Sequence, residues 1–233
     1  MYVHNNAKIF ILTLFLLGAL FSITYAKEKV TTPPSSLGSA NYYELKPSEY
    51  FVSLGVKGYQ QTTSYTCGPA AVMSLLRWYS VLSDADLNSA TEMRIAHEMN
   101  TGSPDSSHPG TMPPAAVEWL EKNGFDVTWG TNGSLEMLRN NLNKGIPTIV
   151  EWSDWGGHWV VVTGYYAGSQ TPEGGRDSIF FADSGTNWTS VNNPNGITSF
   201  NADRFYYMWY DALYSEKIVK GVYITAVPHK KYN

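Results

Sequence analysis

Apolar residues recur at helical spacing in four stretches of the chain, and residues that cap or break helices bound each stretch. Gly68 and Pro69 open the first stretch, and Asn123-Gly124 follows the third. Proline suits the first helical turn because its missing N–H would have no intrahelical partner there. We predict helices from Gly68 to about Tyr79, from a cap at Ser83–Asp86 to about Met99, over Ala115–Lys122, and over Leu135–Leu142.

Later in the chain the pattern changes to short apolar runs, which are typical of strands. One of them is apolar on both faces, which favours a central position in a sheet. The strands that we predict are Phe125–Trp129, Ile146–Trp152, His158–Tyr165, Ser178–Asp183 and Gly221–Val227, with a short extended segment at Tyr50–Gly55 and a helical or turn segment around Trp209. Short connections join the middle three strands into an antiparallel meander. The pattern therefore indicates an α+β fold, with N-terminal helices packed on an antiparallel sheet.

The N-terminal region has the pattern of a cleavable secretory signal. Lys8 precedes an apolar run, and small residues lead up to Ala26. The run is shorter than the roughly 20 residues that a membrane span needs; an uncleaved anchor is the alternative. We expect a signal peptide over 1–26, a flexible leader over 27–40 and one domain over 41–233. The mature protein would be secreted or periplasmic and would have no integral membrane segment.

Charge and cysteine content narrow the classes of function. The formal net charge is −4 and no basic cluster occurs, which argues against nucleic acid as the main partner. The chain has 1 cysteine, Cys67, so no disulfide can form within it. Three roles are open for this thiol: a buried inert residue, a link to another chain, or a nucleophile.

Cys67 lies where an irregular polar loop turns into the first predicted helix. The positive end of the helix dipole favours a thiolate at such a position. Gln61, which lies upstream in the same loop, brings an amide that can donate a hydrogen bond beside the sulfur. A thiolate with an adjacent donor is half of an acyl-transfer site. The competing interpretation is a small buried cysteine in front of an ordinary core helix.

A histidine and an aspartate meet at one edge of the predicted meander. His158 begins one strand and Asp183 ends the next. In antiparallel neighbours the start of one strand lies beside the end of the other. A carboxylate next to a histidine orients the ring and stabilises its charged form. With Cys67 these residues would supply a nucleophile, a base and an orienting group, although each of them alone also suits a turn.

Two motifs carry a resemblance to a known family. Thr66–Ala71 reads Thr-Cys-Gly-Pro-Ala-Ala, and Gly157–Tyr165 reads Gly-His-Trp-Val-Val-Val-Thr-Gly-Tyr. With Gln61 and Asp183, these motifs resemble the bacteriocin-processing (double-glycine) cysteine peptidase family over most of the expected domain. The resemblance implies a papain-like fold. That family often has Asp-Pro where this chain has Asp183-Ser184, and its best-known members are fused to membrane exporters, which this sequence does not show.

The resemblance also implies a role for each matching residue. Cys67 corresponds to the nucleophile, His158 to the general base and acid, and Asp183 to the residue that orients the histidine. Gln61 corresponds to the oxyanion-hole side chain, which works with the backbone N–H of Cys67; neighbouring Gln60 is the alternative. No metal or cofactor is implied.

We therefore expect a secreted, monomeric cysteine peptidase that hydrolyses peptide bonds in a peptide or protein substrate. Two other functions fit the same features: an acyl or peptidyl transferase with the same triad, and a non-catalytic secreted binding module on this fold. His108, in a loop rich in glycine, proline and serine, is a candidate for substrate contact. Trp152, Trp155 and Trp159 either shape a substrate cleft or pack in the core.

Overall fold

The computed structural model describes residues 46–152, 157–168, 177–185, 196–211 and 218–230. The chain divides into two compact units, Met1–Thr31 and Thr32–Asn233, and every described residue belongs to the second. The expected signal peptide and leader lie outside the described residues. Within the described part of the chain, no helix is long and apolar enough to cross a membrane.

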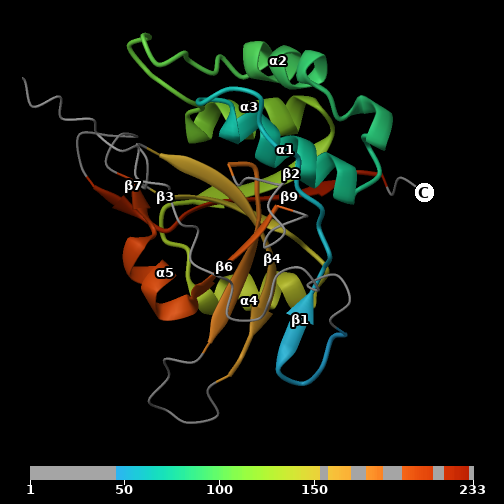
Figure 1. Cartoon of the computed structure of the whole chain (residues 1–233), viewed down its shortest axis with the longest axis vertical. Helices are drawn as coiled ribbons and strands as arrows, with labels where there is room; N and C mark the ends of the chain where they lie inside the picture. Colours follow the sequence, from blue (N-terminus) through green and yellow to red (C-terminus); the bar gives the residue numbers. More distant parts are fainter. Residues whose placement is uncertain (1–45, 153–156, 169–176, 186–195, 212–217, 231–233) are drawn as a thin grey trace, which may run out of the picture. The chain divides into compact units, whose positions relative to one another are not determined.

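An antiparallel sheet runs through the second unit (Figure 1). For the described residues its strand order is β2-β9-β3-β4-β5-β6, and β1 pairs with β4. The strands are β1 Phe51–Ser53, β2 Phe125–Gly130, β3 Thr148–Trp152, β4 His158–Tyr166, β5 Ser178–Asp183, β6 Ile197–Asn201 and β9 Val222–Pro228. A separate ribbon joins β7 Tyr210–Asp211 to β8 Val219–Lys220. The predicted meander of β3, β4 and β5 is confirmed, and β4 has neighbours on both sides, as its apolar run indicated.

Helices cover both faces of this sheet. Their bounds are α1 Cys67–Trp78, α2 Ser89–Glu98, α3 Pro113–Lys122, α4 Leu135–Asn143 and α5 Ala202–Met208, with a short 3-10 turn, η2, at Asp84–Asp86. Helices α1, α2 and α3 share one hydrophobic cluster with the sheet, whereas α4 and α5 share a second one on the opposite face (Figure 1). The predicted α+β fold with N-terminal helices on an antiparallel sheet is confirmed.

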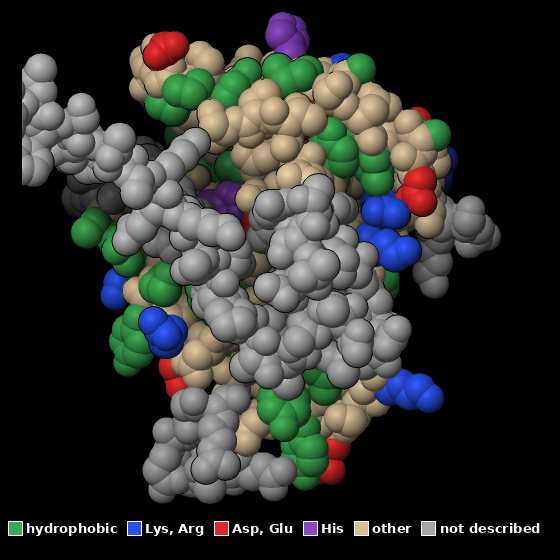
Figure 2. All heavy atoms as spheres, viewed as in Figure 1, with side chains coloured by type: hydrophobic (Ala, Val, Ile, Leu, Met, Phe, Trp, Pro, Cys, Tyr) green, Lys and Arg blue, Asp and Glu red, His purple; other side chains and the backbone are tan. Residues whose placement is uncertain are grey.

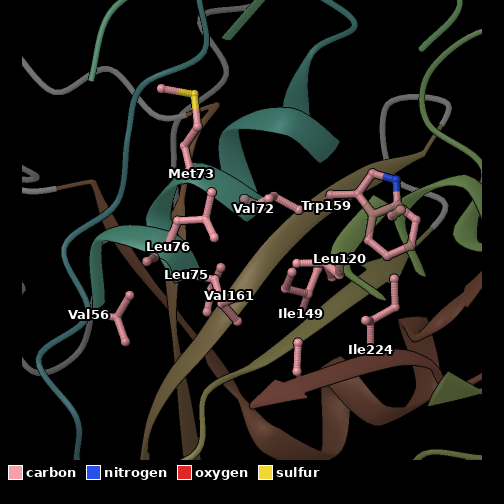
Figure 3. Packing of buried hydrophobic residues seen from close by; sticks show 14 of the residues in the cluster. Val56, Val72, Met73, Leu75, Leu76, Leu120, Ile149, Trp159, Val161 and Ile224 are labelled. Atoms are coloured by element: carbon pink, nitrogen blue, oxygen red, sulfur yellow. The ribbon is translucent and has the colours of Figure 1, made fainter. Parts of the chain in front are cut away.

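Helix α1 is held to the sheet by its apolar face. The side chains of Val72, Leu75 and Leu76 are no more than 3% exposed. Figure 3 shows them in one cluster with Val161 of β4 and Ile149 of β3. Burial of one such side chain contributes about 1.5–3 kcal/mol to stability. These contacts fix the N-terminus of α1, where the cysteine lies, against the sheet.

Alternate residues of the central strands face opposite clusters, because successive side chains of a strand point to opposite sides. Val161 packs with α1, whereas Val160 and Val162 pack with α4 and α5. Trp152 and Phe181 lie on the α4 and α5 face, with ring centroids 5.1 Å apart. Burial on both faces explains why the sequence of β4 is largely apolar.

Helix α2 begins later than predicted. Ser83 and Asp86 form a capping box around the short turn η2, and the chain then leaves the helical conformation. The Asn88 side chain starts α2 by accepting a hydrogen bond from the Thr91 N–H at 3.0 Å. The predicted start was wrong because two capping sites follow each other, and only the second one begins the long helix.

Strand β6 was not predicted from the sequence. Asparagine and glycine residues precede it, and these favour turns. The strand forms through antiparallel pairing with β5, in which Thr198 lies opposite Phe181. Strand formation depends strongly on such long-range context, which local patterns do not reveal.

Charged side chains are dispersed over the face that Figure 2 shows. Lysine and arginine side chains of the described residues lie there in small separate groups, and acidic side chains are scattered in the same way. The described part of this face therefore has no broad basic surface.

Candidate active site

Cys67 is the first residue of α1 and lines a pocket on the face of the sheet that α1, α2 and α3 cover. Its side chain is buried, and the residue is 6% exposed. Because Cys67 begins the helix, its backbone N–H has no acceptor within the helix. The position therefore combines a thiol, a backbone donor and the positive end of the helix dipole.

A buried carboxylate, Glu92 of α2, holds the loop that leads to Cys67. Its oxygens accept hydrogen bonds from the Thr62 N–H at 3.0 Å, the Thr62 hydroxyl at 2.7 Å and the Tyr59 hydroxyl at 3.0 Å. They also accept a bond from the Thr66 hydroxyl, directly before the cysteine. One side chain thus fixes both ends of the loop in front of α1.

Sequence reasoning missed Glu92, although a signal was present. Glu92 falls on the same helical face as Ile95, Ala96 and Met99, and all four are buried. A charged residue within a buried apolar stripe must find hydrogen-bonding partners, because an unpaired charge is costly to bury. The hydroxyl-rich loop before Cys67 supplies those partners.

His158 and Asp183 meet at the edge of the sheet, as their strand positions predicted. The His158 Nε2 atom lies 2.8 Å from Asp183 Oδ1. Both residues are buried, with 6% and 4% exposed. The Cys67 side chain lies close enough to the His158 ring to raise its pKa. Because Asp183 engages Nε2, the nitrogen that remains for the sulfur is Nδ1.

Asp183 is anchored by more than the histidine. Its Oδ1 atom also accepts the Gly185 N–H at 2.9 Å, and its Oδ2 atom accepts the Thr198 hydroxyl at 3.1 Å. Gly185 approaches the site so closely that an added methyl carbon would lie 3.0 Å from the His158 ring. The unpredicted strand β6 therefore completes the support of the carboxylate through Thr198.

The surroundings of His158 decide its charge. Burial lowers the pKa of the ring, but the hydrogen bonds and charges of Asp183 and Cys67 raise it, and the net result is a pKa above the ordinary histidine value. The ring is therefore protonated at neutral pH. A protonated imidazole beside a cysteine is the arrangement that, in general, favours a thiolate.

Gln61 is fixed beside the turn that follows Asp183. Its backbone N–H donates to the Ser184 carbonyl at 3.1 Å, and the Ser184 hydroxyl donates to its Oε1 atom at 2.8 Å. The Nε2 atom donates one hydrogen to the Thr63 carbonyl at 2.7 Å. An amide nitrogen carries a second hydrogen, which remains as a donor. Gln60 is exposed whereas Gln61 is half-buried, so the arrangement favours Gln61.

His108 lies apart from this constellation. Its side chain is exposed, and its Nδ1 atom lies 3.0 Å from the Ser107 hydroxyl. The described pocket beside Cys67 is lined by the next residues of the same loop, 109–113, and His108 is not among its lining residues. The structure therefore gives no support to His108 as a contact residue.

The tryptophans divide between the two interpretations that the sequence left open. Trp152 is a core residue whose ring meets the His158 ring edge-on, with centroids 5.9 Å apart. Trp159 packs in the core and also lines the pocket. Its Nε1 atom donates a hydrogen bond to the Thr111 carbonyl at 3.0 Å. This bond joins β4 to residues 109–113, which we call the pocket loop. Trp155 lies outside the described residues.

Two buried carboxyl groups that the sequence did not single out line the same pocket as Cys67. They are Glu151 of β3 and Asp211 of β7, and each residue is 4% exposed. The signal for Glu151 was its position inside an otherwise apolar strand. Among the described residues, no group of three histidine, cysteine or acidic side chains is arranged to hold a metal ion.

Several solved structures are similar to this one. A C39-like peptidase from Bacillus anthracis has a TM-score of 0.53 and 15% identity, covering 79% of this chain and 100% of that one. The peptidase domain of Streptococcus ComA, a bifunctional ABC transporter of a quorum-sensing pathway, has a TM-score of 0.48 and 19% identity. The match covers 74% of this chain and 98% of that one. A double-glycine motif protease from an AMS/PCAT transporter, solved with the leader peptide, has a TM-score of 0.47 and 13% identity. The match covers 78% of this chain and 99% of that one. Sequence identities this low allow a comparison of the fold alone. The Bacillus anthracis structure supports a fold shared with this chain.

No curated protein matches this chain. The family described as Peptidase_C39 like matches residues 53–213, which is more than half of the 233-residue sequence. The matched range contains Cys67, His158 and Asp183. The resemblance to the double-glycine peptidases is confirmed at the level of the family: the chain belongs to the Peptidase_C39-like family of cysteine peptidases.

Proposed function

We propose that the chain is an exported peptidase that hydrolyses peptide bonds with Cys67 as nucleophile, His158 as general base and acid, and Asp183 as the residue that orients the histidine. The observation that carries this proposal is the continuous series of contacts from Asp183 Oδ1 through the His158 ring to the Cys67 side chain. A nucleophile beside a base that is itself oriented by a third group performs acyl transfer on unrelated folds.

The reaction would proceed in two halves. The Cys67 thiolate attacks the substrate carbonyl, and a C–S bond forms while the carbonyl oxygen takes the negative charge. The Cys67 N–H and the second hydrogen of Gln61 Nε2 stabilise that charge. Protonated His158 gives its proton to the leaving amine as the C–N bond breaks. His158 then takes a proton from water, whose oxygen displaces the thiol and releases a carboxylic acid.

Export is supported by the basic start, the short apolar run and the small residues that end at Ala26. In a secreting host that produces the full chain, the exported protein should begin near Lys27. Mass spectrometry of the protein outside the cytoplasm tests this directly. Recovery of the full-length chain in the cytoplasm or membrane alone would count against export.

A peptide library tests the chemistry without knowledge of the natural substrate. The mature protein is incubated with the library in water enriched in heavy oxygen, and the products are analysed by mass spectrometry. Hydrolysis places one heavy oxygen in each new carboxyl group. We expect cleavage that disappears in Cys67→Ala and His158→Ala, and that persists in His97→Ala, a control at an exposed histidine of α2.

The same experiment separates the other functions. With an added amine, a transferase would give products that carry the amine and no heavy oxygen. A binding module would retain peptides without changing their mass. Cleavage that survives in Cys67→Ala would contradict the proposed nucleophile.

A further inference from the structure

The pocket beside Cys67 combines apolar walls with acidic side chains. Apolar side chains form much of its wall, among them Pro109, Met112 and Trp159. Two carboxyl groups, Glu151 and Asp211, line it as well. We call this cavity the acidic pocket and the two carboxyl groups the acid pair.

Strand pairing accounts for the position of the acid pair. Glu151 pairs with Trp159 of β4 on one side and with Val222 of β9 on the other, so it lies in the middle of the sheet. The side chain of Asp211, in β7, forms a hydrogen bond with the side chain of Glu151. Gly157, which also lines the pocket, leaves space for the carboxyl group, because an added methyl carbon there would lie 3.2 Å from Glu151 Oε1.

One oxygen of Glu151 has no hydrogen-bond donor. The residue is 4% exposed, and its Oε2 atom is buried and accepts no hydrogen bond from any described group. No lysine or arginine in the described part of the chain forms an ion pair with Glu151. A buried polar atom without a partner is rare and needs an explanation, and a cation bound beside Glu151 would supply one.

The electrostatics agree with this geometry. The pKa of Glu151 is raised to about 9, mainly by burial. The charge and hydrogen bond of Asp211 and the charge of Cys67 also raise this pKa, whereas the charge of His158 lowers it. At neutral pH Glu151 therefore holds a proton. A cation that enters the pocket would replace that proton and pair with both carboxylates.

We propose that the acidic pocket binds a positively charged side chain of the substrate, a lysine or arginine close to the bond that is cleaved. This inference rests on the proposed function, because it assigns the substrate class of the same site. Lysine and arginine side chains have an apolar stem and a charged end, which matches apolar walls with an acid pair. Since the pocket is lined by Cys67 itself, the charged residue lies next to the scissile bond.

The test uses two series of iodoacetamides that alkylate Cys67, one with an amine at the end of an alkyl chain and one with a methyl group there. In each reaction the thiolate forms a C–S bond and iodide leaves. The series extend over increasing chain lengths, and the rate ratio of charged to neutral probe is measured at neutral pH. We expect the ratio to reach about tenfold at one chain length, because a hydrogen bond to a charged partner contributes about that much.

Variants separate a built site from the general field of an acidic protein. Glu151→Gln and Asp211→Asn should lower the ratio to about one, and circular dichroism spectra that match the spectrum of the unaltered protein show that the variants fold. Glu121→Gln removes an exposed charge at the far end of α3 and should leave the ratio unchanged. A ratio that shows no optimum with chain length, or that falls equally in Glu121→Gln, would overturn the inference. Slow reaction of both series in the unaltered protein would instead contradict the proposed function.

Discussion

Asp183 acts on His158 through its charge as well as through its geometry, because the carboxylate both accepts the ring hydrogen and faces a buried ring. The substitution Asp183→Asn keeps an acceptor oxygen and removes the charge. The pKa of His158 should fall, and alkylation of Cys67 below neutral pH should slow by about tenfold, as for one pKa unit. Asp183→Ala also removes the acceptor, and the loss should reach about a hundredfold.

A matched substitution lies at the other end of the same strand. Asp177 accepts a hydrogen bond from the Tyr165 hydroxyl at 2.7 Å, outside the site. Asp177→Asn therefore controls for a general loss of stability. Equal alkylation rates in Asp183→Asn and the unaltered protein would show that the carboxylate has no part in activating the thiol.

Glu151 should make the stability of the protein depend on pH. Its pKa is raised by burial and by Asp211 from 4.5 to about 9, so the folded state holds a proton that the unfolded state releases. Stability from this group is complete below about pH 4.5 and is lost as the pH rises toward 9. The free energy of unfolding, measured with urea, should fall by up to about 1.4 kcal/mol per pH unit in this range.

The substitution Glu151→Gln removes this titration and should flatten that slope. At alkaline pH the variant should then be more stable than the unaltered protein, although both carry a polar group at the position. Glu121→Gln, at an exposed position, should leave the slope as it was. An identical slope in Glu151→Gln would show that the carboxyl group does not bind a proton on folding.

At the scale of elements, α2 is connected to the site through Glu92 and the loop before Cys67. Glu92→Gln keeps the size of the side chain and removes the charge that several donors share. We expect the free energy of unfolding to fall by about 1–3 kcal/mol. Because the loop carries Gln61 and ends at Cys67, the pH profile of alkylation should also change. Met93 is 39% exposed on the same helix, so Met93→Gln should change neither the free energy of unfolding nor the pH profile of alkylation.

The pH profile distinguishes positioning from simple support. If Glu92 only stabilises the fold, Glu92→Gln will lower stability and leave the pH profile of Cys67 alkylation unaltered. That outcome would reduce Glu92 to a structural residue. A changed profile at temperatures where the variant is folded is the result that we expect.

Helix α1 and the pocket loop meet at Gly68. An added methyl carbon at this position would lie 2.6 Å from the Thr111 Cβ atom, so Gly68→Ala must displace the loop. Overpacking of this kind costs about 1–3 kcal/mol. Thr111→Gly removes the obstructing atoms, and the double variant should recover part of the loss. Strictly additive effects of the two substitutions on unfolding would argue against this contact.

Local patterns were sufficient for most elements and insufficient for the way in which they pair. The helix at Leu135 was predictable because its apolar residues have a clear helical period after a cap at Ser134. The strand at His158 was predictable because it is a continuous apolar run with a clear boundary. Strand β6 and the position of β9 between β2 and β3 were not, since both depend on partners far away in the sequence. The start of α2 was misplaced because two caps compete for it.

At the scale of the whole molecule, the site is assembled from segments that are distant in the chain. The juxtaposition of His158 and Asp183 was predictable because His158 begins one strand of the meander and Asp183 ends its antiparallel neighbour. Glu92, Glu151 and Asp211 were not predicted, because their contacts come from packing between elements and leave only a polar residue within an apolar pattern. Such interruptions are the sequence feature that indicates buried groups of this kind.

The central claim is that His158 keeps Cys67 in a reactive, ionised form. The most direct measurement is the rate of Cys67 alkylation by a small iodoacetamide as a function of pH, in the mature protein and in His158→Ala. An ordinary cysteine thiol titrates near a pKa of about 8.5 and reacts little in acid. We predict fast alkylation well below neutral pH that collapses in His158→Ala. A rate that rises only above neutral pH, with the same profile in both proteins, would contradict the account.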